Sequence, residues 1–378
     1  MHQEQRKRTV DLLKQHGINR ALFTDPHTIT WLTGFAPPIQ TGSNLFEGSP
    51  PLIWYEDGQF ILVVVNNYAT QAAHLDQDSD GKVIIYMGYT VQDPLSGIPN
   101  LQLTMRELMK RSVARGKVGI EMSHCTLLVS NAMQEILPAM EFVPLDGWLE
   151  PLRMIKTDEE LVKLRQNFAL IEVGHAVARK IVKPGLREID VWSEVHGAIE
   201  REAGCRVPLG NDCIVGYRQQ NIGGWPKAHE LKADDSLIVD LSTILHGYWS
   251  DSCATYFATE PNATHKKLHQ TVSEALDMAR SLIKPGVKAN HIDQQTRQFI
   301  ADAGYNVYRH HTGHGVGVSG HEEPRIVPYN ETKLQSGMVI MLEPGIYLPG
   351  QTGVRLEDAY LVTADGAEQL THHDKRLP

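Results

Sequence analysis

The segment Ile181-Val182-Lys183-Pro184-Gly185-Leu186 returns, with conservative changes, as Leu282-Ile283-Lys284-Pro285-Gly286-Val287. Each copy follows an Ala-containing helical stretch and precedes an Ile-Asp pair by a few residues. Each then reaches an apolar strand that ends in an acid, Asp240 in the first copy and Glu343 in the second. The proline and the acid are 56 residues apart in the first copy and 58 in the second. One Lys-Pro-Gly match would be unremarkable, but the combined match favours an internal duplication, with two α/β halves related by pseudo-twofold symmetry around one central site.

Two pairs of acids flank predicted β-hairpins. Asp240 and Asp251 lie on either side of a turn at His246-Gly247, and we expect them to face each other directly across the hairpin. Glu343 and Glu357 flank a second predicted hairpin in the same way. Directly opposed like charges destabilise a sheet, unless a cation lies between them. Solvated acids at strand ends would explain one pair, whereas two pairs at repeat-related positions favour a cation site.

A glycine-flanked histidine, His314, provides a further candidate ligand, and His321 follows seven residues later. The flanking glycines let the backbone approach a metal ion or a substrate closely. The alternative of a phosphate-binding loop lacks the Lys-Ser/Thr ending that such loops carry. Four carboxylates and one imidazole can hold two divalent ions, and such a pair activates water and polarises a carbonyl group. His229 precedes the Asp240 strand. Its position alone does not distinguish a site residue from an ordinary histidine of a surface loop.

The first part of the chain alternates helix and strand patterns, which is typical of an α/β layer domain. We expect helices over residues 1–16, 101–114 and 127–137, and strands over residues 21–23, 52–55, 60–65, 82–86 and 118–121. Thr157 and Glu160 form the pattern of a capping box, which predicts the start of a long helix. We therefore expect an N-terminal domain over residues 1–150 and a second domain over residues 151–378.

The composition and charge of the chain argue against several classes of protein. The 378 residues, 42% hydrophobic and 21% charged, are ordinary for a soluble protein of two domains. The net charge of −9 argues against a nucleic-acid partner, which requires a positive face. The charged start of the chain does not resemble a signal peptide, and no apolar run is long enough to span a membrane. The four scattered cysteines favour reduced thiols and a cytoplasmic location.

Taken together, these stretches resemble the pita-bread metallohydrolases, and most closely the branch of prolidase and aminopeptidase P, which also includes the metal-free relative creatinase. The resemblance covers nearly the whole chain. The motifs that carry it are Ile29–Phe35, Leu152–Thr157, His310–Gly317, His321–Pro324, Glu343–Tyr347 and Val354–Asp358. It implies an α/β creatinase-like N-terminal domain followed by a pita-bread catalytic domain.

The resemblance also implies roles for the candidate residues. Asp240 would hold one metal ion, His314 and Glu343 the other, and Asp251 and Glu357 would bridge the two. Glu343 would in addition relay a proton. The residues expected to contact the substrate are His229, His310, His321 and Arg355, of which His229 and His321 would also stabilise the tetrahedral oxyanion.

By the same resemblance, a metal-bound hydroxide would attack an amide carbonyl, with two manganese, cobalt or zinc ions as cofactors. The expected substrate is a small peptide with an Xaa-Pro bond, either a dipeptide or the N-terminus of a longer peptide, and the expected assembly is a homodimer.

Two departures from the family pattern leave the substrate open. Ser242 stands where the family usually has Gly after the first acid, and Ala254 stands where it usually has Arg after the second. These positions orient ligands and remove none of them. A hydrolase or lyase for a small non-peptide metabolite, of the creatinase or ectoine-hydrolase kind, is the main alternative. A non-enzymatic binding protein is the third possible function. Such relatives tend to lose metal ligands, however, and all five candidate ligands are present here.

Overall fold

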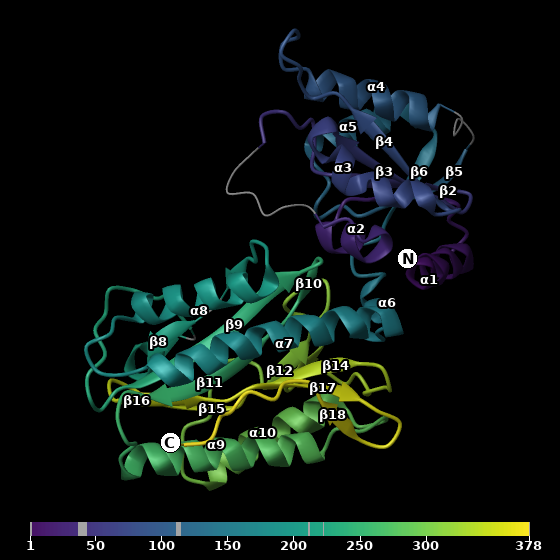
Figure 1. Cartoon of the computed structure of the whole chain (residues 1–378). Coiled ribbons are helices and arrows are strands. Elements are labelled where there is room, and N and C mark those ends of the chain that lie inside the picture. The colour runs from purple at the N-terminus through teal and green to yellow at the C-terminus, as the bar shows by residue number, and fades with distance from the viewer. Residues whose placement is uncertain (1, 37–43, 111–114, 211, 222, 378) are drawn as a thin grey trace. The chain divides into compact units, whose positions relative to one another are not determined.

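The structure is a computed structural model that describes residues 2–36, 44–110, 115–210, 212–221 and 223–377. The chain divides into two compact units, Met1–Leu152 and Arg153–Pro378, called the N-terminal and C-terminal units below. Figure 1 labels their elements. None of the helices in the described ranges combines the length and the apolar character that crossing a bilayer requires.

The N-terminal unit is an α/β layer on a six-stranded sheet with the order β4-β3-β2-β1-β5-β6. Its strands are β1 (Arg20–Phe23), β2 (Leu52–Glu56), β3 (Gln59–Val65), β4 (Gly81–Tyr86), β5 (Gly116–Ile120) and β6 (Met140–Pro144). Its helices are α1 (Gln3–Gln15), α2 (Pro26–Thr33), α3 (Ala69–Ala72), α4 (Gly97–Met109) and α5 (Leu127–Ile136), and α6 (Glu150–Met154) crosses the boundary between the units. The predicted strands and helices are all found, which confirms the α/β class. The expected end of the second predicted helix, at residues 111–114, lies outside the described residues.

The sequence did not predict α2 or β6, and it placed Glu121 inside β5. In α2 the side chains from Thr28 to Thr33 are all buried, so the helix has no polar face to reveal its period. Glu121 directly follows β5, and its carboxylate binds the start of α2, whose N-cap is Asp25. Its Oε2 accepts hydrogen bonds from the backbone N–H groups of Thr24 and Asp25, both at 2.8 Å, and its Oε1 accepts one from Thr28 at 2.6 Å.

The C-terminal unit contains two helix pairs, and Figure 1 shows them on opposite sides of its strands. The first pair is α7 (Asp158–Ile181) and α8 (Glu188–Ala203), and the second is α9 (Ala263–Ser281) and α10 (Ala289–Asp302). The strands of the first half are β7 (Leu209–Gly210), β8 (Cys213–Val215), β9 (Ser236–Leu245), β10 (Tyr248–Trp249) and β11 (Ser252–Phe257). Those of the second are β12 (Gly313–Gly315), β13 (Glu322–Ile326), β14 (Val339–Leu342), β15 (Gly345–Leu348), β16 (Thr352–Arg355), β17 (Asp358–Val362) and β18 (Ala367–Gln369).

The repeated Lys-Pro-Gly segments form the loops within the two helix pairs. Gly185 and Gly286 adopt φ values of 87° and 88°, which glycine tolerates better than other residues. The N–H of Gly185 donates to the carbonyl of Leu231 at 2.9 Å, and the N–H of Gly286 donates to that of Leu334 at 2.8 Å. The two halves therefore repeat the same loop contact, as the internal duplication predicts. The capping box at the start of α7, between Thr157 and Glu160, is also present.

The first acid-bearing hairpin has a different register from the one we expected. His246 and Gly247 both have positive φ, 53° and 77°, and form a two-residue turn that pairs Leu245 with Tyr248. This turn shifts the ladder by two residues, so that Asp240 faces Cys253 rather than Asp251. The prediction of direct opposition is therefore wrong, although an offset of two residues keeps both acids on one face of the sheet.

The second hairpin has the expected register. Leu342 pairs with Asp358 in the inner ladder, and Gly345 pairs with Arg355 in the outer one, so both ladders follow one alignment in which Glu343 corresponds to Glu357. Neither glutamate belongs to a ladder itself, because each lies in the gap between the two.

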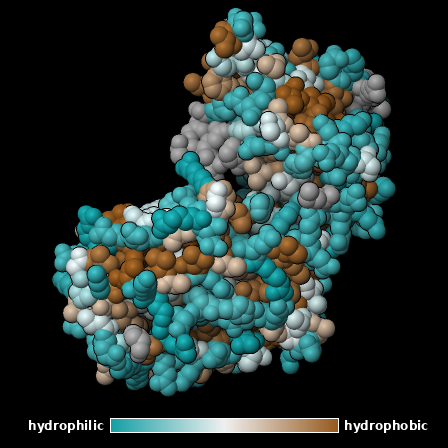
Figure 2. Space-filling model, viewed as in Figure 1, coloured by the Kyte–Doolittle hydropathy of each residue, from teal (hydrophilic) through white to brown (hydrophobic). Residues whose placement is uncertain are grey.

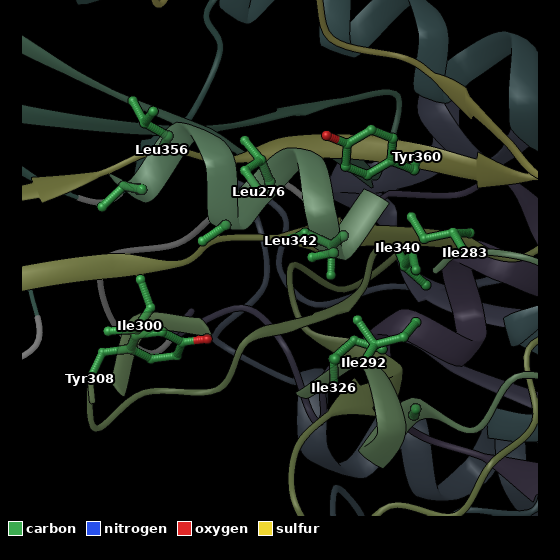
Figure 3. Packing of buried hydrophobic residues seen from close by; sticks show 14 of the residues in the cluster. Leu276, Ile283, Ile292, Ile300, Tyr308, Ile326, Ile340, Leu342, Leu356 and Tyr360 are labelled. Carbon is green, nitrogen blue, oxygen red and sulfur yellow. The ribbon is translucent and has the colours of Figure 1, made fainter. Parts of the chain in front are cut away.

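A hydrophobic core between the second helix pair and its sheet fixes the backbone beside these glutamates. Figure 3 shows side chains from α9, α10 and β14 packed together, among them Leu276, Ile292 and Ile340. Leu342 and Leu356 belong to the same cluster, and each directly precedes one of the two glutamates. Burying a leucine side chain stabilises a fold by about 1.5–3 kcal/mol, so the acids extend from a firmly packed frame.

Candidate metal centre

The two acid-bearing hairpins are joined by hydrogen bonds between β11 and β16. The N–H of Glu357 donates to the carbonyl of Cys253 at 2.9 Å. The hydroxyl of Thr255 donates to the carbonyl of Arg355 at 2.9 Å and accepts from the N–H of Arg355 at 3.0 Å. The four acids therefore converge from two hairpins that lie far apart in the sequence.

His314 lies at the centre of the acids. Its Nε2 is 3.8 Å from Asp251 Oδ2, 3.7 Å from Glu343 Oε1 and 3.9 Å from Glu357 Oε1. Its Nδ1 donates to the carbonyl of Gly315 at 2.9 Å, so the lone pair of Nε2 is directed at the acids. Burial lowers the pKa of His314 to about 3, which keeps the ring in the neutral form that binds metals.

Glu357 is the acid of the cluster whose carboxylate lacks hydrogen bonds among the described residues. The residue is 1% exposed, and within the described part of the chain neither of its oxygens has a hydrogen-bond partner. Burial, and then the charges of Asp251 and Glu343, raise its pKa well above the ordinary value. A buried carboxylate of this kind needs either a proton or a cation. Ligand atoms of Asp251, His314 and Glu357 all lie within 4.8 Å of one another, which is suitable for one cation.

Asp240 is held by a predicted substrate residue, Arg355. Nη2 of Arg355 donates to Asp240 Oδ2 at 2.6 Å and to Asp212 Oδ2 at 2.7 Å. Burial raises the pKa of Asp240 despite the opposing charge of Arg355. Arg355 Nη1 also donates to the hydroxyl of Tyr347 at 3.2 Å. The arginine is therefore placed to orient an acid of the cluster.

Glu343 differs from the other acids because histidines surround it. His311 Nε2 lies 2.6 Å from its Oε1, and His310 Nδ1 lies 3.7 Å from its Oε2. Burial alone would raise the pKa of Glu343, but the hydrogen bond from His311 lowers it below the ordinary value. Glu343 is thus the acid of the cluster whose surroundings most favour the ionised form.

His310 connects the cluster to a cavity of about 610 Å³. Its Nε2 lies 2.9 Å from the hydroxyl of Tyr347, and both residues line the cavity. Burial lowers the pKa of His310 to about 4, so its ring is neutral near pH 7. The described wall of the cavity also includes Gly216, Gln219 and the segment 306–309.

The two histidines expected to stabilise the oxyanion lie in different surroundings. The ring of His321 packs against that of His314, with centroids 4.1 Å apart, and so belongs to the cluster. His229 instead hydrogen-bonds through Nε2 to the hydroxyl of Tyr217. Its loop is held by the buried residue Glu188, whose N–H donates to the His229 carbonyl at 2.9 Å and whose carboxylate accepts from the N–H of Lys227 at 3.0 Å.

Several residues of the site were not predicted from the sequence, among them His311, Arg325 and Tyr217. His311 was visible as the second member of the His310-His311 pair, but only the first was used. Arg325 follows the His321–Pro324 motif directly, and its Nη2 lies 3.1 Å from His311 Nδ1. Tyr217 reaches His229 from the 3-10 helix Gly216–Asn221, which carries no recognisable motif.

The departure at Ser242 affects the site directly, because this residue hydrogen-bonds to Asp251. Burial raises the pKa of Asp251 well above the ordinary value, as do the charges of Asp240 and Glu343, whereas the Ser242 hydrogen bond lowers it. At the other departure, Ala254 is fully buried and pairs with Val239 in the β9–β11 ladder.

The donor set fits divalent cations. Several buried carboxylates face a neutral imidazole, and that of Glu357 has no hydrogen-bond partner among the residues that the structure describes. Hard oxygen donors with one imidazole suit first-row divalent ions.

Comparisons with known proteins agree with this chemistry. The family described as metallopeptidase family M24 matches residues 163–364, and the creatinase/prolidase N-terminal domain matches residues 5–155. An Xaa-Pro dipeptidase of Lactobacillus delbrueckii subsp. lactis is 30% identical over 370 residues, which cover 97% of this chain and 96% of that protein.

Two solved structures are similar over nearly their full lengths. The Xaa-Pro dipeptidase from Bacillus anthracis has a TM-score of 0.84 at 26% identity, covering 100% of this chain and 99% of its own. The prolidase from Pyrococcus horikoshii OT3 has a TM-score of 0.83 at 25% identity, covering 99% of this chain and 100% of its own. The pita-bread architecture expected from the sequence is thereby confirmed, and the chain belongs to metallopeptidase family M24, with a creatinase/prolidase N-terminal domain.

Proposed function

We propose that this chain hydrolyses Xaa-Pro peptide bonds, using two divalent ions of manganese, cobalt or zinc. The proposed ligands are Asp240, Asp251, His314, Glu343 and Glu357. The observation that carries the metal assignment is the buried carboxylate of Glu357, because its two unpartnered oxygens suit a ligand that bridges two cations. The peptidase assignment is supported by the near full-length similarity to the Xaa-Pro dipeptidase of L. delbrueckii.

Divalent ions held by these residues would lower the pKa of bound water and polarise a substrate carbonyl. The protein's own part begins with Glu343, which accepts a proton on its carboxylate and passes it to the leaving nitrogen. His311 holds Glu343 in place through the contact of 2.6 Å.

The substrate is held by residues around the cluster. His321 and His229 donate hydrogen bonds to the substrate and to the oxyanion that develops from its carbonyl. His310 and Tyr347 line the cavity of about 610 Å³, which has room for a small peptide. Arg355 lies behind this wall and hydrogen-bonds to Tyr347.

Arg325 favours a dipeptide over a longer peptide. Its Nη2 contacts His311, and its buried Nε has no hydrogen-bond partner among the described residues. A guanidinium group in this state suits the free carboxylate of a substrate that ends one residue after the scissile bond.

The catalytic residues all fall within residues 151–378, which we propose as the catalytic domain, with residues 1–150 as a separate N-terminal domain.

We further propose a homodimer. In the N-terminal unit the large apolar side chains of Val91, Ile98 and Leu103 are more than half exposed, as a protein contact surface requires, and Figure 2 shows hydrophobic groups on this unit. Sedimentation analysis tests the assembly. The cytoplasmic location inferred from the cysteines stays a prediction, which fractionation of cells tests.

A substrate panel tests the activity. Purified protein is assayed on Xaa-Pro dipeptides, longer Xaa-Pro peptides and small amidines, with added manganese and again after chelation. We expect cleavage of the dipeptides that is lost on chelation and restored by metal. Bound metal without cleavage of any peptide would contradict the peptidase assignment, and full activity without metal would contradict the metal assignment.

A further inference from the structure

A buried ion pair lies behind the loop that carries His321. Nζ of Lys156 donates to Glu322 Oε2 at 2.7 Å and to the carbonyl of Arg153 at 2.8 Å. The side chains of Lys156 and Glu322 are 1% and 3% exposed, so the pair is shielded from water. Glu322 directly follows His321 in the chain and begins β13.

The ion pair occupies the space next to Gly317 of the His314 motif. A Cβ atom on Gly317 would lie 2.5 Å from Glu322 Oε2 and 2.6 Å from Lys156 Nζ, closer than any real contact. Gly317 has no positive φ, so the closeness of these two side-chain ends, and not backbone conformation, favours glycine here. The other carboxylate oxygen of Glu322 accepts from the N–H of Ser319 at 3.2 Å. The pair thus closes the loop from Gly317 to Glu322.

This loop is what holds His321 in position. The His321 ring packs against His314 and His311, with centroids 4.1 and 5.3 Å apart. No hydrogen bond of the ring is found within the described ranges, so its backbone and these ring contacts set its orientation. Lys156 itself is firmly anchored, because its N–H donates to the carbonyl of Gly337 at 2.9 Å and it precedes the capping box of α7.

We propose that Lys156 is a positioning residue for hydrolysis, which holds Glu322 and thereby keeps His321 over the metal centre. The inference rests on the proposed function, in which His321 contacts the substrate. A buried ion pair often contributes little to stability compared with apolar side chains of the same size. Its position, one residue from His321 and against Gly317, is explained by a role in geometry. Lys156 belongs to the junction motif Leu152–Thr157, and Glu322 belongs to the motif His321–Pro324. The two motifs would then act together to position His321.

The first test compares Lys156→Met with Lys266→Met. Lys266 also pairs with a glutamate, Glu260, at 2.7 Å, but both side chains are at least half exposed. We expect Lys156→Met to lower kcat about 10-fold or more while bound metal, measured by elemental analysis, stays unchanged. The Lys266→Met control should keep the wild-type rate. A wild-type kcat in Lys156→Met would overturn the proposal.

The second test asks whether the effect passes through His321. In a His321→Ala background, Lys156→Met should cause no further loss of kcat, because the group that it positions is gone. An equal loss in both backgrounds would mean that Lys156 acts by another route. If Lys156→Met does not fold, Lys156→Met/Glu322→Gln takes its place, since this variant removes both charges of the Lys156–Glu322 pair and still releases the loop.

The third test does not depend on activity, and so separates this proposal from the proposed function. In protein with isotope-labelled histidine, the His321 ring signals are assigned by their loss in His321→Ala. Lys156→Met should shift these signals and leave those of His229 in place. Unchanged His321 signals would overturn the positioning role even if the peptidase assay succeeds. A shift in a protein that cleaves no Xaa-Pro peptide would refute only the proposed function.

Discussion

Nε2 of His311 lies 2.6 Å from Oε1 of Glu343, so the carboxylate proposed to relay the proton has a fixed partner on one oxygen. The same hydrogen bond lowers the pKa of Glu343 against the effect of burial, while the pKa values of the other three acids of the cluster are raised. Glu343 is therefore the acid of the cluster that most favours the ionised form, which can bind a cation.

Glu343→Ala removes a metal ligand and the proton relay together. We expect kcat to fall by about 10²–10⁴ or more, the usual contribution of a positioned general acid–base group. Steady-state assays at saturating manganese give the rate, and elemental analysis gives the bound metal. Glu274→Ala, on the surface of α9, is the control. Near-native turnover of Glu343→Ala would refute the assigned role.

Glu357→Gln should change stability in opposite directions with and without metal. In metal-free protein it replaces a buried, unpartnered acid by a neutral amide, so the melting temperature should rise. In wild-type protein, metal at 100 times its Kd adds about 2.7 kcal/mol to the free energy of unfolding, and the variant should lose most of this gain. Calorimetry of both forms, with and without chelator, provides the comparison. A variant that is stabilised by metal as much as wild type would show that Glu357 is not a ligand.

Ser242→Ala removes the hydroxyl that hydrogen-bonds to Asp251. Groups that orient a ligand usually change metal affinity by about 10- to 100-fold, and we expect a loss at the lower end of this range. Ser242→Thr keeps the hydroxyl and should keep the affinity. Titration calorimetry with manganese measures both variants. Equal affinities for Ser242→Ala and Ser242→Thr would mean that the hydroxyl does not matter.

Glu121 in the N-terminal unit provides a test of pH dependence away from the metal centre. Burial raises its pKa to about 7, so the folded chain keeps a proton on Glu121 that the unfolded chain releases near pH 4.5. Its contribution to stability is complete at low pH and is lost as the pH rises through this window, by up to about 3 kcal/mol.

The amide of Glu121→Gln does not titrate in this range. The stability of wild type relative to the variant should therefore fall as the pH rises from 5 to 7.5. Melting curves at saturating metal, with Glu107→Gln as an exposed control, measure the difference. A constant difference across this pH range would contradict the prediction.

The sequence predicted those features that local chemistry determines. Thr157 and Glu160 identify a helix start because the capping box is a contact between neighbours in the chain. The repeated Lys-Pro-Gly segments, together with an acid at the end of each following strand, predicted two related halves. His314 and the acids around it were identified from strand ends and flanking glycines.

The features that were missed or wrong depend on the backbone or on distant contacts. The register of Asp240 was wrong by two residues because it depends on the positive φ of His246, which a non-glycine residue seldom adopts. Helix α2 was missed because its residues are buried on every side, so burial hides the helical period. His311 and Arg325 acquire their importance only from side chains that the fold brings beside them.

The unsatisfied carboxylate of Glu357 has a consequence for the life of the protein in a cell. A newly made chain that has not yet bound its ions carries the free-energy cost of burying the Glu357 carboxylate without a partner. It therefore populates open, protease-sensitive states more often than the metal-bound chain does. Ion supply then controls how many molecules survive after synthesis, in addition to how fast each survivor works.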